Sequence, residues 1–234
     1  MFETTIRDDV LRLARPETRW LSSGWNGGFS DANAAYNVSV PAGFQRTDLD
    51  AYIDERRTSA RFGRPGPTLL TGVDLRHARG TRYGSVEVVV TAGISNPAAL
   101  PMTSSEETRS LDDTWDVGSD VGTVNVILGT THALDDGSLA TLLSVAVEAK
   151  TATLLAETGF PGTTDAVIAA CDPNGEEETF AGSGTPIGAA ARACVRDAVQ
   201  ASLRSRYANR EVPSSVKDAD YGVTTEVQSE TFRL

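Results

Sequence analysis

Lysine, histidine and cysteine are scarce in this chain, and each scarcity disfavours a class of protein. Lys150 is one of only two lysines among 21 basic residues, and there are two histidines. So few histidines disfavour a histidine-rich metal centre. The two cysteines, Cys171 and Cys194, stand in apolar surroundings without metal-ligand spacing. We interpret them as small buried side chains rather than as a disulfide framework.

Long apolar runs are also missing. No segment approaches the roughly eighteen apolar residues that a membrane-spanning helix needs. Residues 1–9 lack the basic start and the apolar core of a secretory signal. We therefore expect a cytoplasmic protein that does not associate with a membrane.

Positive charge is outweighed by negative charge. Asp and Glu number 32, and the formal net charge is −11. An acidic excess almost without lysine is expected of a halophilic protein, because very high salt screens self-repulsion over a few ångströms. The alternative is a GC-rich genome that favours arginine. In either case the sequence lacks the basic stripe of nucleic-acid-binding proteins, so nucleic acid is disfavoured as a partner.

The length and the hydrophobic content indicate one well-packed domain. The chain has 234 residues, of which 40% are hydrophobic. We expect a single domain over residues 1–207. The polar stretch 98–119 is interpreted as a loop insertion, and residues 208–234 as a polar C-terminal tail or edge strand.

The clearest structural unit lies between residues 122 and 171. It contains three segments in succession: a strand at 122–130, a helix at 138–158 and a strand at 166–171. This order fits a right-handed strand–helix–strand crossover. Asn125 in the first strand, and Glu148 and Lys150 in the helix, are polar residues inside apolar elements. Such groups carry a desolvation cost, so we expect them to have a role.

The remaining elements are shorter or less regular. Within residues 2–23 we expect two or three short antiparallel strands, with turns near 8–9 and 16–17. Further strands are expected at 36–40, 69–75, 85–91, 179–181 and 223–232. Helices are expected at 47–60, with Thr47 as the cap, and at 187–207. Most strands come early and the longest helices late. This order favours a mixed α/β fold, with one layered domain, a mixed sheet and about three main helices packed against it.

Two glycine-rich stretches suit the close approach of a ligand to the backbone. The first is residues 22–29, for which a plain loop is the alternative. The second, residues 182–185, precedes the last helix and suits an anion site, although it matches neither the Walker loop nor the dinucleotide fingerprint. The structural alternative is that Thr185 caps the helix and Pro186 opens it.

Glu148 and Lys150 are two residues apart on a predicted helix, so their side chains point in different directions. Lys150 keeps lysine in a chain that otherwise uses arginine. This choice suits a need for a compact ammonium or a tunable pKa. The alternative is a solvated helix surface.

Hydrolysis of an amide needs a nucleophile or activated water, a base, and donors for the oxyanion. Candidates for these roles are Asp74, Ser95, Thr163, Thr164 and Asp165. The last of these stands beside two threonines at the glycine-flanked start of a strand. No Gly-x-Ser-x-Gly elbow is present, and a Ser-His-Asp triad cannot be identified. On the residues alone, an enzyme and a binding domain with clustered polar loops both remain open.

Several stretches, taken in order, resemble one known family. They are residues 21–23 with 27–28, 70–74, 91–96, 122–128, 148–152, 162–167 and 181–185. Their order and spacing are similar to those of the adenosylcobinamide amidohydrolases of corrinoid salvage. Residues 182–185 depart from a version in that family that is richer in hydroxyl groups and histidine.

The resemblance implies hydrolysis of the amide between aminopropanol and a corrin side chain of adenosylcobinamide, which yields adenosylcobyric acid for coenzyme B12 synthesis. The implied catalytic groups are Asp165 or Glu148 as base, Thr163, Thr164 or Ser95 as nucleophile or oxyanion donor, and Lys150 as electrostatic partner. The implied substrate contacts are Ser22, Ser23, Asp74, Asn96, Asn125, Ser183 and Thr185, with the two asparagines as orienting groups. The cobalt belongs to the substrate, so no cofactor or metal held by protein side chains is expected.

Two alternatives from other classes remain. One is a corrinoid-binding protein without catalysis, which would bind cobinamide and release no aminopropanol. The other is an amidohydrolase or acyltransferase that acts on another substrate. The expected partner is the corrinoid small molecule, and a homo-oligomer is left open.

Overall fold

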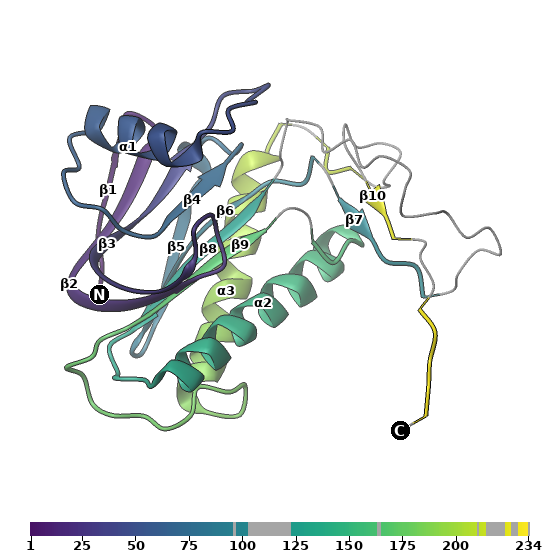
Figure 1. Cartoon of the computed structure of the whole chain (residues 1–234). Helices are drawn as coiled ribbons and strands as arrows, with labels where there is room; N and C mark the ends of the chain where they lie inside the picture. The colour runs from purple at the N-terminus through teal and green to yellow at the C-terminus, as the bar shows by residue number, and fades with distance from the viewer. Residues whose placement is uncertain are drawn as a thin grey trace.

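The computed structural model describes residues 1–95, 97–102, 123–162, 165–209, 211–213, 223–225 and 229–233. The strands are β1 (Glu3–Arg7), β2 (Val10–Ser22), β3 (Gly28–Ser39), β4 (Thr68–Thr71), β5 (Arg79–Tyr83), β6 (Val86–Ala92), β7 (Ala98–Ala99), β8 (Val124–Thr130), β9 (Ala166–Cys171) and β10 (Val223–Thr224). The helices are α1 (Leu49–Ser59), the short 3₁₀ helix η1 (Leu75–His77), α2 (Asp136–Thr158) and α3 (Pro186–Arg206). The predicted mixed α/β domain with three main helices is confirmed (Figure 1).

The main sheet is mixed. Its strand order is β4-β3-β2-β9-β8-β6-β5, and β1 joins it by pairing with β2. β8 and β9 are parallel neighbours connected through α2, as predicted for the segment 122–171. β9 pairs antiparallel with β2, and β8 pairs antiparallel with β6.

The sheet folds back on itself at a bend in β2. The pairing of β2 with β3 changes register between Ala14 and Thr18, and Glu17 has a positive φ of 51°. The first half of β2 pairs with β1 and its second half with β9. Apolar side chains from both halves of the folded sheet meet between the two layers: Phe2, Leu11, Leu13, Trp20, Ala35, Leu69, Leu75, Val89, Ile127, Ile168 and Ala170.

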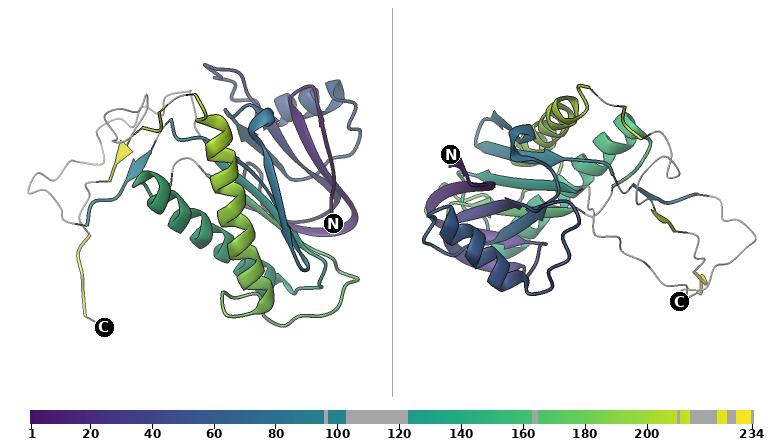
Figure 2. Two further views of the ribbon diagram at one scale, coloured as in Figure 1. Left: turned by 180° about the vertical axis from the view of Figure 1, so that it is seen from behind. Right: turned by 90° about the horizontal axis from the view of Figure 1, so that it is seen from above.

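Helices cover both outer faces of the folded sheet. α2 and α3 pack on β6, β8 and β9 through the largest apolar cluster of the molecule. α1 packs on the opposite outer face, over the first half of β2 and the second half of β3. The two views in Figure 2 show α2 and α3 together on one side and α1 on the other. The result is a four-layer arrangement of helix, sheet, sheet and helices.

The two long helices begin at side-chain caps. Thr185 Oγ1 accepts a hydrogen bond from the Gly188 N–H at 3.0 Å, and Pro186 is the first residue of α3, which is the structural alternative given for residues 182–185. Asp135 Oδ1 accepts one from the Ser138 N–H at 2.6 Å at the start of α2. Because α2 has this cap, it begins two residues earlier than the predicted helix at 138–158.

Several other predicted boundaries were wrong. The strand expected at 36–40 is the second half of β3, which begins at Gly28, inside the stretch 22–29 for which a plain loop was the alternative. The turn expected at 16–17 lies inside β2, because the chain forms a bulge there and the strand continues. The strand expected at 69–75 ends at Thr71, because Asp74 accepts a hydrogen bond from the Arg76 N–H and caps η1. Asp48, not Thr47, occupies the cap position of α1.

Two further differences concern whole strands. The short strand expected at 179–181 does not form; the chain there makes only an isolated bridge between Glu177 and Ala133. β5 was not predicted, because its sequence Arg-Gly-Thr-Arg-Tyr is polar and lacks the β-branched run of a typical strand. β5 forms at the edge of the sheet, where polar residues are tolerated.

The predicted insertion and tail lie mostly outside the described residues. Of residues 98–119, only 98–102 are described, and they contain β7. β7 pairs in parallel with β10, which is the strand found within the stretch 223–232. The proposed domain boundary near residue 207 stays a prediction.

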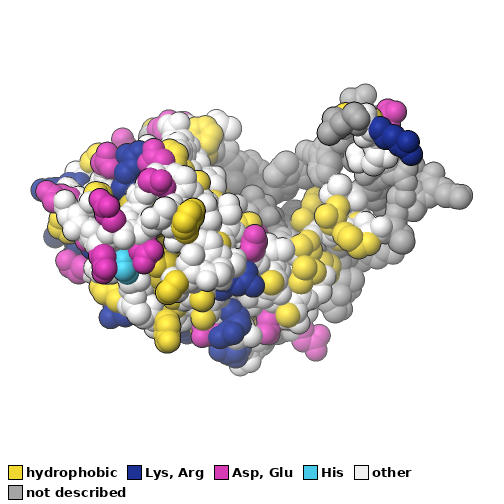
Figure 3. Space-filling view, turned by 90° about the horizontal axis from the view of Figure 1, so that it is seen from below, with side chains coloured by type: hydrophobic (Ala, Val, Ile, Leu, Met, Phe, Trp, Pro, Cys, Tyr) yellow, Lys and Arg dark blue, Asp and Glu magenta, His cyan; other side chains and the backbone are white. Residues whose placement is uncertain are grey.

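The surface and α2 bear on two predictions from composition. Seen from below, acidic side chains crowd one part of the surface (Figure 3), as expected from the negative net charge.

Among the described helices, α2 alone is long and apolar enough to cross a membrane, a test that a buried core helix also passes. α2 packs against β9 and α3, and Leu139, Leu142 and Leu154 on it are fully buried, which is the packing of a core helix.

Candidate functional site

The space between the two sheet layers becomes polar at one end. This end lies where β4 and β6 finish and where β8 and β9 begin. Six buried polar residues gather there: Ser22, Asn37, Thr71, Thr91, Thr123 and Asn125. Buried polar groups are costly unless they are paired, so this end of the core differs in kind from the apolar remainder.

Asn125 is the centre of the buried polar residues. Its Nδ2 donates to Asn37 Oδ1 at 2.9 Å and to the Leu70 carbonyl at 2.8 Å. Asn37 Nδ2 in turn donates to Thr91 Oγ1 at 2.9 Å. These bonds join β3 and β4 of one layer to β6 and β8 of the other. Asn125 Oδ1 is a buried hydrogen-bond acceptor that has no donor among the described residues. Most buried polar atoms in folded proteins do have a partner.

A second link between the layers lies beside Asn125. Thr71 and Thr123 share a hydrogen bond of 2.9 Å through their hydroxyl groups. Thr71 Oγ1 also accepts from the Val73 N–H at 3.0 Å. The two threonines fix the end of β4 against the start of β8.

Lys150 and Asp165 form an ion pair at the same end of the sheet. Lys150 lies on α2, and Asp165 directly precedes β9. The Lys150 Nζ donates to Asp165 Oδ2, and Asp165 Oδ1 accepts from the Val124 N–H at 3.1 Å. The two side chains are only 6% and 9% exposed. A carboxylate and an ammonium are thus held together out of water, at the start of both parallel strands.

Gly162 allows the loop before β9 to reach this ion pair. A Cβ atom at this position would lie 2.8 Å from Asp165 Oδ2 and 3.4 Å from Lys150 Nζ. A side chain at residue 162 would therefore press on both charged groups. Glycine at residue 162 is therefore explained by its close packing against the ion pair.

Ser22 and Ser23 border the site from the end of β2. Ser22 Oγ accepts from the Gly24 N–H at 3.1 Å. Ser23 Oγ accepts from the Val167 N–H at 2.9 Å, and Val167 is two residues after Asp165. Ser22 thus shapes the loop after β2, and Ser23 holds that loop beside the start of β9.

The structure does not bring all predicted site residues to this end. The Glu148 side chain is 63% exposed and contacts Arg192 and Ser183 on the outer surface, away from the Lys150–Asp165 pair. Thr185 is the cap of α3, and Asp74 is an exposed cap of η1 that also pairs with Arg76.

Four other candidates can be placed only in part. Ser95 is partly buried and lies three residues after the end of β6. Asn96, Thr163 and Thr164 lie outside the described residues. Their predicted roles stay predictions.

Sequence reasoning missed Asn37 and the role of Thr71, Thr91 and Thr123. Three of them had a signal in their position: Asn37, Thr71 and Thr91 each lie two places after an apolar residue that faces the space between the layers, namely Ala35, Leu69 and Val89. That alternation marks an inward-facing position in a strand. Thr123 lies two places before the polar Asn125. The sequence did not show that these four positions meet.

The titratable groups outside the ion pair behave as structural groups. Burial raises the pKa of the Cys171 and Cys194 thiols, which are both unpaired and buried as predicted. Burial and the nearby Arg76 guanidinium lower the pKa of His77. Within the described part of the chain, His, Cys, Asp and Glu side chains form no group of three or more suited to a metal ion.

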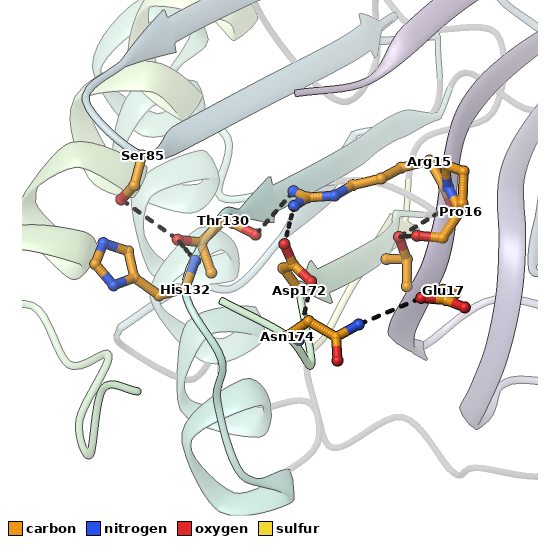
Figure 4. A network of polar contacts seen from close by, with 9 residues as sticks. Arg15, Pro16, Glu17, Ser85, Thr130, His132, Asp172 and Asn174 are labelled. Carbon is orange, nitrogen blue, oxygen red and sulfur yellow. Dashed lines mark hydrogen bonds and ion pairs between the residues drawn. The ribbon is translucent and has the colours of Figure 1, made fainter. Parts of the chain in front are cut away.

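A different polar network fastens the opposite end of the sheet (Figure 4). The Arg15 guanidinium pairs with Asp172 and donates to the Thr130 carbonyl at 3.4 Å. Asp172 Oδ1 accepts from the Asn174 N–H at 3.0 Å, and Asn174 reaches Glu17 at 3.4 Å. These contacts tie the bend of β2 to the ends of β8 and β9, so this network holds the folded sheet together.

Comparison with known proteins identifies the family. A sequence model of the family described as adenosylcobinamide amidohydrolase matches residues 3–211. This chain belongs to the adenosylcobinamide amidohydrolase family. An adenosylcobinamide amidohydrolase of Halobacterium salinarum is 52% identical over 236 residues, which cover 100% of each chain. Another, of Methanosarcina mazei, is 28% identical over 213 residues, or 86% of this chain and 97% of that protein.

The resemblance stated from the sequence is thereby confirmed. The halophilic character expected from the composition fits the similarity to a Halobacterium protein. Among solved structures, the PH0078 protein from Pyrococcus horikoshii OT3 is similar over 86% of this chain and 78% of that chain, with a TM-score of 0.45 and 11% identity. At that level of similarity nothing about the function of the amidohydrolase follows from it.

Proposed function

We propose that this chain hydrolyses the amide between 1-amino-2-propanol and a corrin side chain of adenosylcobinamide. The products are adenosylcobyric acid and 1-amino-2-propanol, and the reaction returns salvaged corrinoid to coenzyme B12 synthesis. One observation carries the proposal. It is the 52% identity, over the whole length of both chains, to a protein named adenosylcobinamide amidohydrolase.

The Lys150–Asp165 pair supports a hydrolytic role at the polar end of the sheet. Asp165 is a carboxylate that can take a proton from water or from a hydroxyl nucleophile. The buried ammonium of Lys150 balances its charge, and the Val124 N–H fixes its orientation. Glu148 is less suited to act as the base because its carboxylate lies on the exposed surface beside Arg192.

The remaining roles complete the proposal. Thr163, Thr164 or Ser95 supplies the nucleophile or the oxyanion donor, and Asn96 and Asn125 orient the amide. Ser22 and Ser23 lie on the border of the site beside β9, where a substrate arm would pass. Thr185, Ser183 and Asp74 have structural partners of their own, which favours structural roles for them.

One assay tests the proposal against its rivals. The protein is incubated with adenosylcobinamide in molar KCl, and cobyric acid and aminopropanol are measured. Hydrolysis releases the two products in equal amounts. Tight binding of cobinamide without release would indicate a corrinoid-binding protein. Failure both to bind and to cleave corrinoids would indicate an enzyme for another substrate.

We also propose that the reaction needs no metal held by protein side chains, and that cobalt enters only with the substrate. Overnight treatment with a chelator, followed by its removal, is expected to change turnover by less than about twofold, because the proposed base and its electrostatic partner are Asp165 and Lys150. Loss of activity that returns with zinc would contradict this proposal.

The place of action is proposed as the cytoplasm, with the corrinoid as the small-molecule partner. The packing of α2 as a core helix supports a role away from the membrane. The acidic net charge supports the absence of nucleic acid among its partners.

A further inference from the structure

A groove lies between the loop joining β2 to β3 and helix α1. Its volume is about 400 Å³. Its lining combines aromatic rings with carboxylates and includes Ser22, Trp25, Phe29, Asp31, Asp50 and Asp54. None of the roles proposed above uses this groove, except that Ser22 belongs to both places.

Trp25 presents a fixed aromatic surface in the groove. It is 49% exposed, yet its Nε1–H donates to Asp50 Oδ1 at 2.9 Å. Asn26 Nδ2 donates to the same oxygen at 3.1 Å. The indole is therefore held against α1 while much of its surface stays open. Phe29, 44% exposed, adds a second ring, and Arg19 lies 5.2 Å from the centre of that ring.

Three glycines shape the backbone around the groove. A Cβ atom on Gly27 would lie 2.3 Å from the Ser22 carbonyl oxygen, and one on Gly66 would lie 2.0 Å from that of Ala34. Gly28 has a φ of 105°, which suits glycine. A side chain at residue 27 or 66 would clash with a backbone carbonyl, and one at residue 28 would strain the backbone, so glycine lets the segments that line the groove approach one another closely.

The charges of the groove favour one kind of ligand. Its lining includes three aspartates and Arg57, which donates to Asp54 at 2.7 Å. Asp31 pairs with Arg19 at 3.3 Å. Asp50 Oδ1 accepts from Trp25 and Asn26. Each carboxylate keeps further lone pairs, and the three carboxylates outnumber the two guanidinium groups beside them. Carboxylates repel a phosphate, whereas they accept hydrogen bonds from hydroxyl and amino groups. Flat aromatic rings bind a nucleobase by stacking. The combination suits a nucleoside without a phosphate.

We propose that this groove binds the adenosyl group of the substrate, with the adenine on Trp25 and the ribose hydroxyls facing the aspartates. This inference rests on the proposed function, because that substrate carries a nucleoside without a phosphate. The groove ends at Ser22, and the adjacent Ser23 bonds to Val167, two residues after Asp165. The adenosyl group would thus lie on the side of the hydrolytic site opposite to α2.

The test compares Trp25→Ala with the wild-type protein on two substrates in molar KCl. On adenosylcobinamide, we expect KM to rise about tenfold with kcat within twofold, because stacking of a base on an aromatic ring is lost. On cobinamide without the adenosyl group, we expect no comparable rise. Trp25→Phe should recover most of the affinity. Tyr83→Ala, which removes an exposed ring on β5, is the matched control and should leave both substrates unaffected.

A binding measurement keeps the inference separate from the proposed function. Free 5′-deoxyadenosine should quench the fluorescence of Trp25 and compete with adenosylcobinamide, and Trp25→Ala should abolish the quenching. An unchanged KM in Trp25→Ala, an equal rise for both substrates, or no quenching by the nucleoside would overturn the inference. If the wild-type protein cleaves neither corrinoid, the proposed function fails, and the fluorescence titration alone then decides whether the groove binds a nucleoside.

Discussion

At the scale of single residues, variants of the Lys150–Asp165 pair can separate an effect on turnover from an effect on the stability of the fold. Asp165→Asn removes the charge of the proposed base. We expect turnover of adenosylcobinamide to fall at least about 100-fold. The same change leaves the Lys150 ammonium buried without its anion, so the free energy of unfolding should drop by about 3–5 kcal/mol. Steady-state kinetics and urea unfolding, both in molar KCl, measure the two effects.

Two controls distinguish a lost base from a damaged fold. The double variant Lys150→Met with Asp165→Leu replaces the ion pair by apolar groups; it should recover much of the stability and none of the turnover. Glu148→Gln changes a surface carboxylate and should keep turnover within about twofold, since surface substitutions are usually mild. Near-normal turnover of a folded Asp165→Asn protein would remove Asp165 as the base.

At this scale the sequence drew attention to Lys150 for a physical reason, and the structure buries Lys150 in an ion pair with Asp165. Lysine is otherwise almost absent, so its retention at residue 150 pointed to a need that arginine does not meet. The sequence did not decide between Glu148 and Asp165 as the base. Glu148 is nearer along the chain, but the helix turns its side chain outward, and the loop before β9 brings Asp165 to Lys150.

At the scale of elements, the start of α2 should make stability depend on pH. Hydrogen bonds from Ser138 lower the pKa of the Asp135 carboxyl below its ordinary value of 3.8. A carboxylate whose pKa is lower in the folded state adds stability above its unfolded pKa, and that stability is lost as pH falls through the folded pKa. Acidification from pH 5 toward pH 3 should therefore weaken α2.

The variant Asp135→Asn tests this dependence, because asparagine still caps a helix but does not titrate. The free energy of unfolding of both proteins is measured between pH 3 and pH 6 in molar KCl. We expect the difference between them to shrink as the pH falls. A difference that stays constant across this range would show that Asp135 does not contribute through its charge.

The long elements were predictable because their signals are local. The apolar runs of β8 and β9 and the caps of α3 can be found within a few residues of each element. The bulge in β2 and the edge strand β5 were not, because a bulge and a polar edge strand are stabilised by neighbouring strands rather than by their own sequence.

At the scale of the whole molecule, the net charge of −11 should make the fold depend on salt. Screening extends over about 10 Å at 0.1 M salt and about 3 Å at 1 M, so self-repulsion weakens as salt is added. We expect the melting temperature to rise by roughly 5–10 °C between 0.1 M and 2 M KCl, which corresponds to about 2–3 kcal/mol for a domain of this size. An uncharged osmolyte at equal water activity is the control. A melting temperature that ignores KCl would contradict the halophilic interpretation.

The sequence by itself determined the charge, the crossover unit of β8, α2 and β9, the cap of α3 and the family, because composition, periodicity and ordered motifs are properties of the chain. Only the tertiary structure decided that the sheet folds into two layers. That folding brings Asn37 to Asn125, 88 residues away, and Trp25 to Asp50 on α1. Such contacts depend on where a strand bends and which layers pack together. No local pattern encodes that choice, since it is made by the apolar area that the two layers bury against each other.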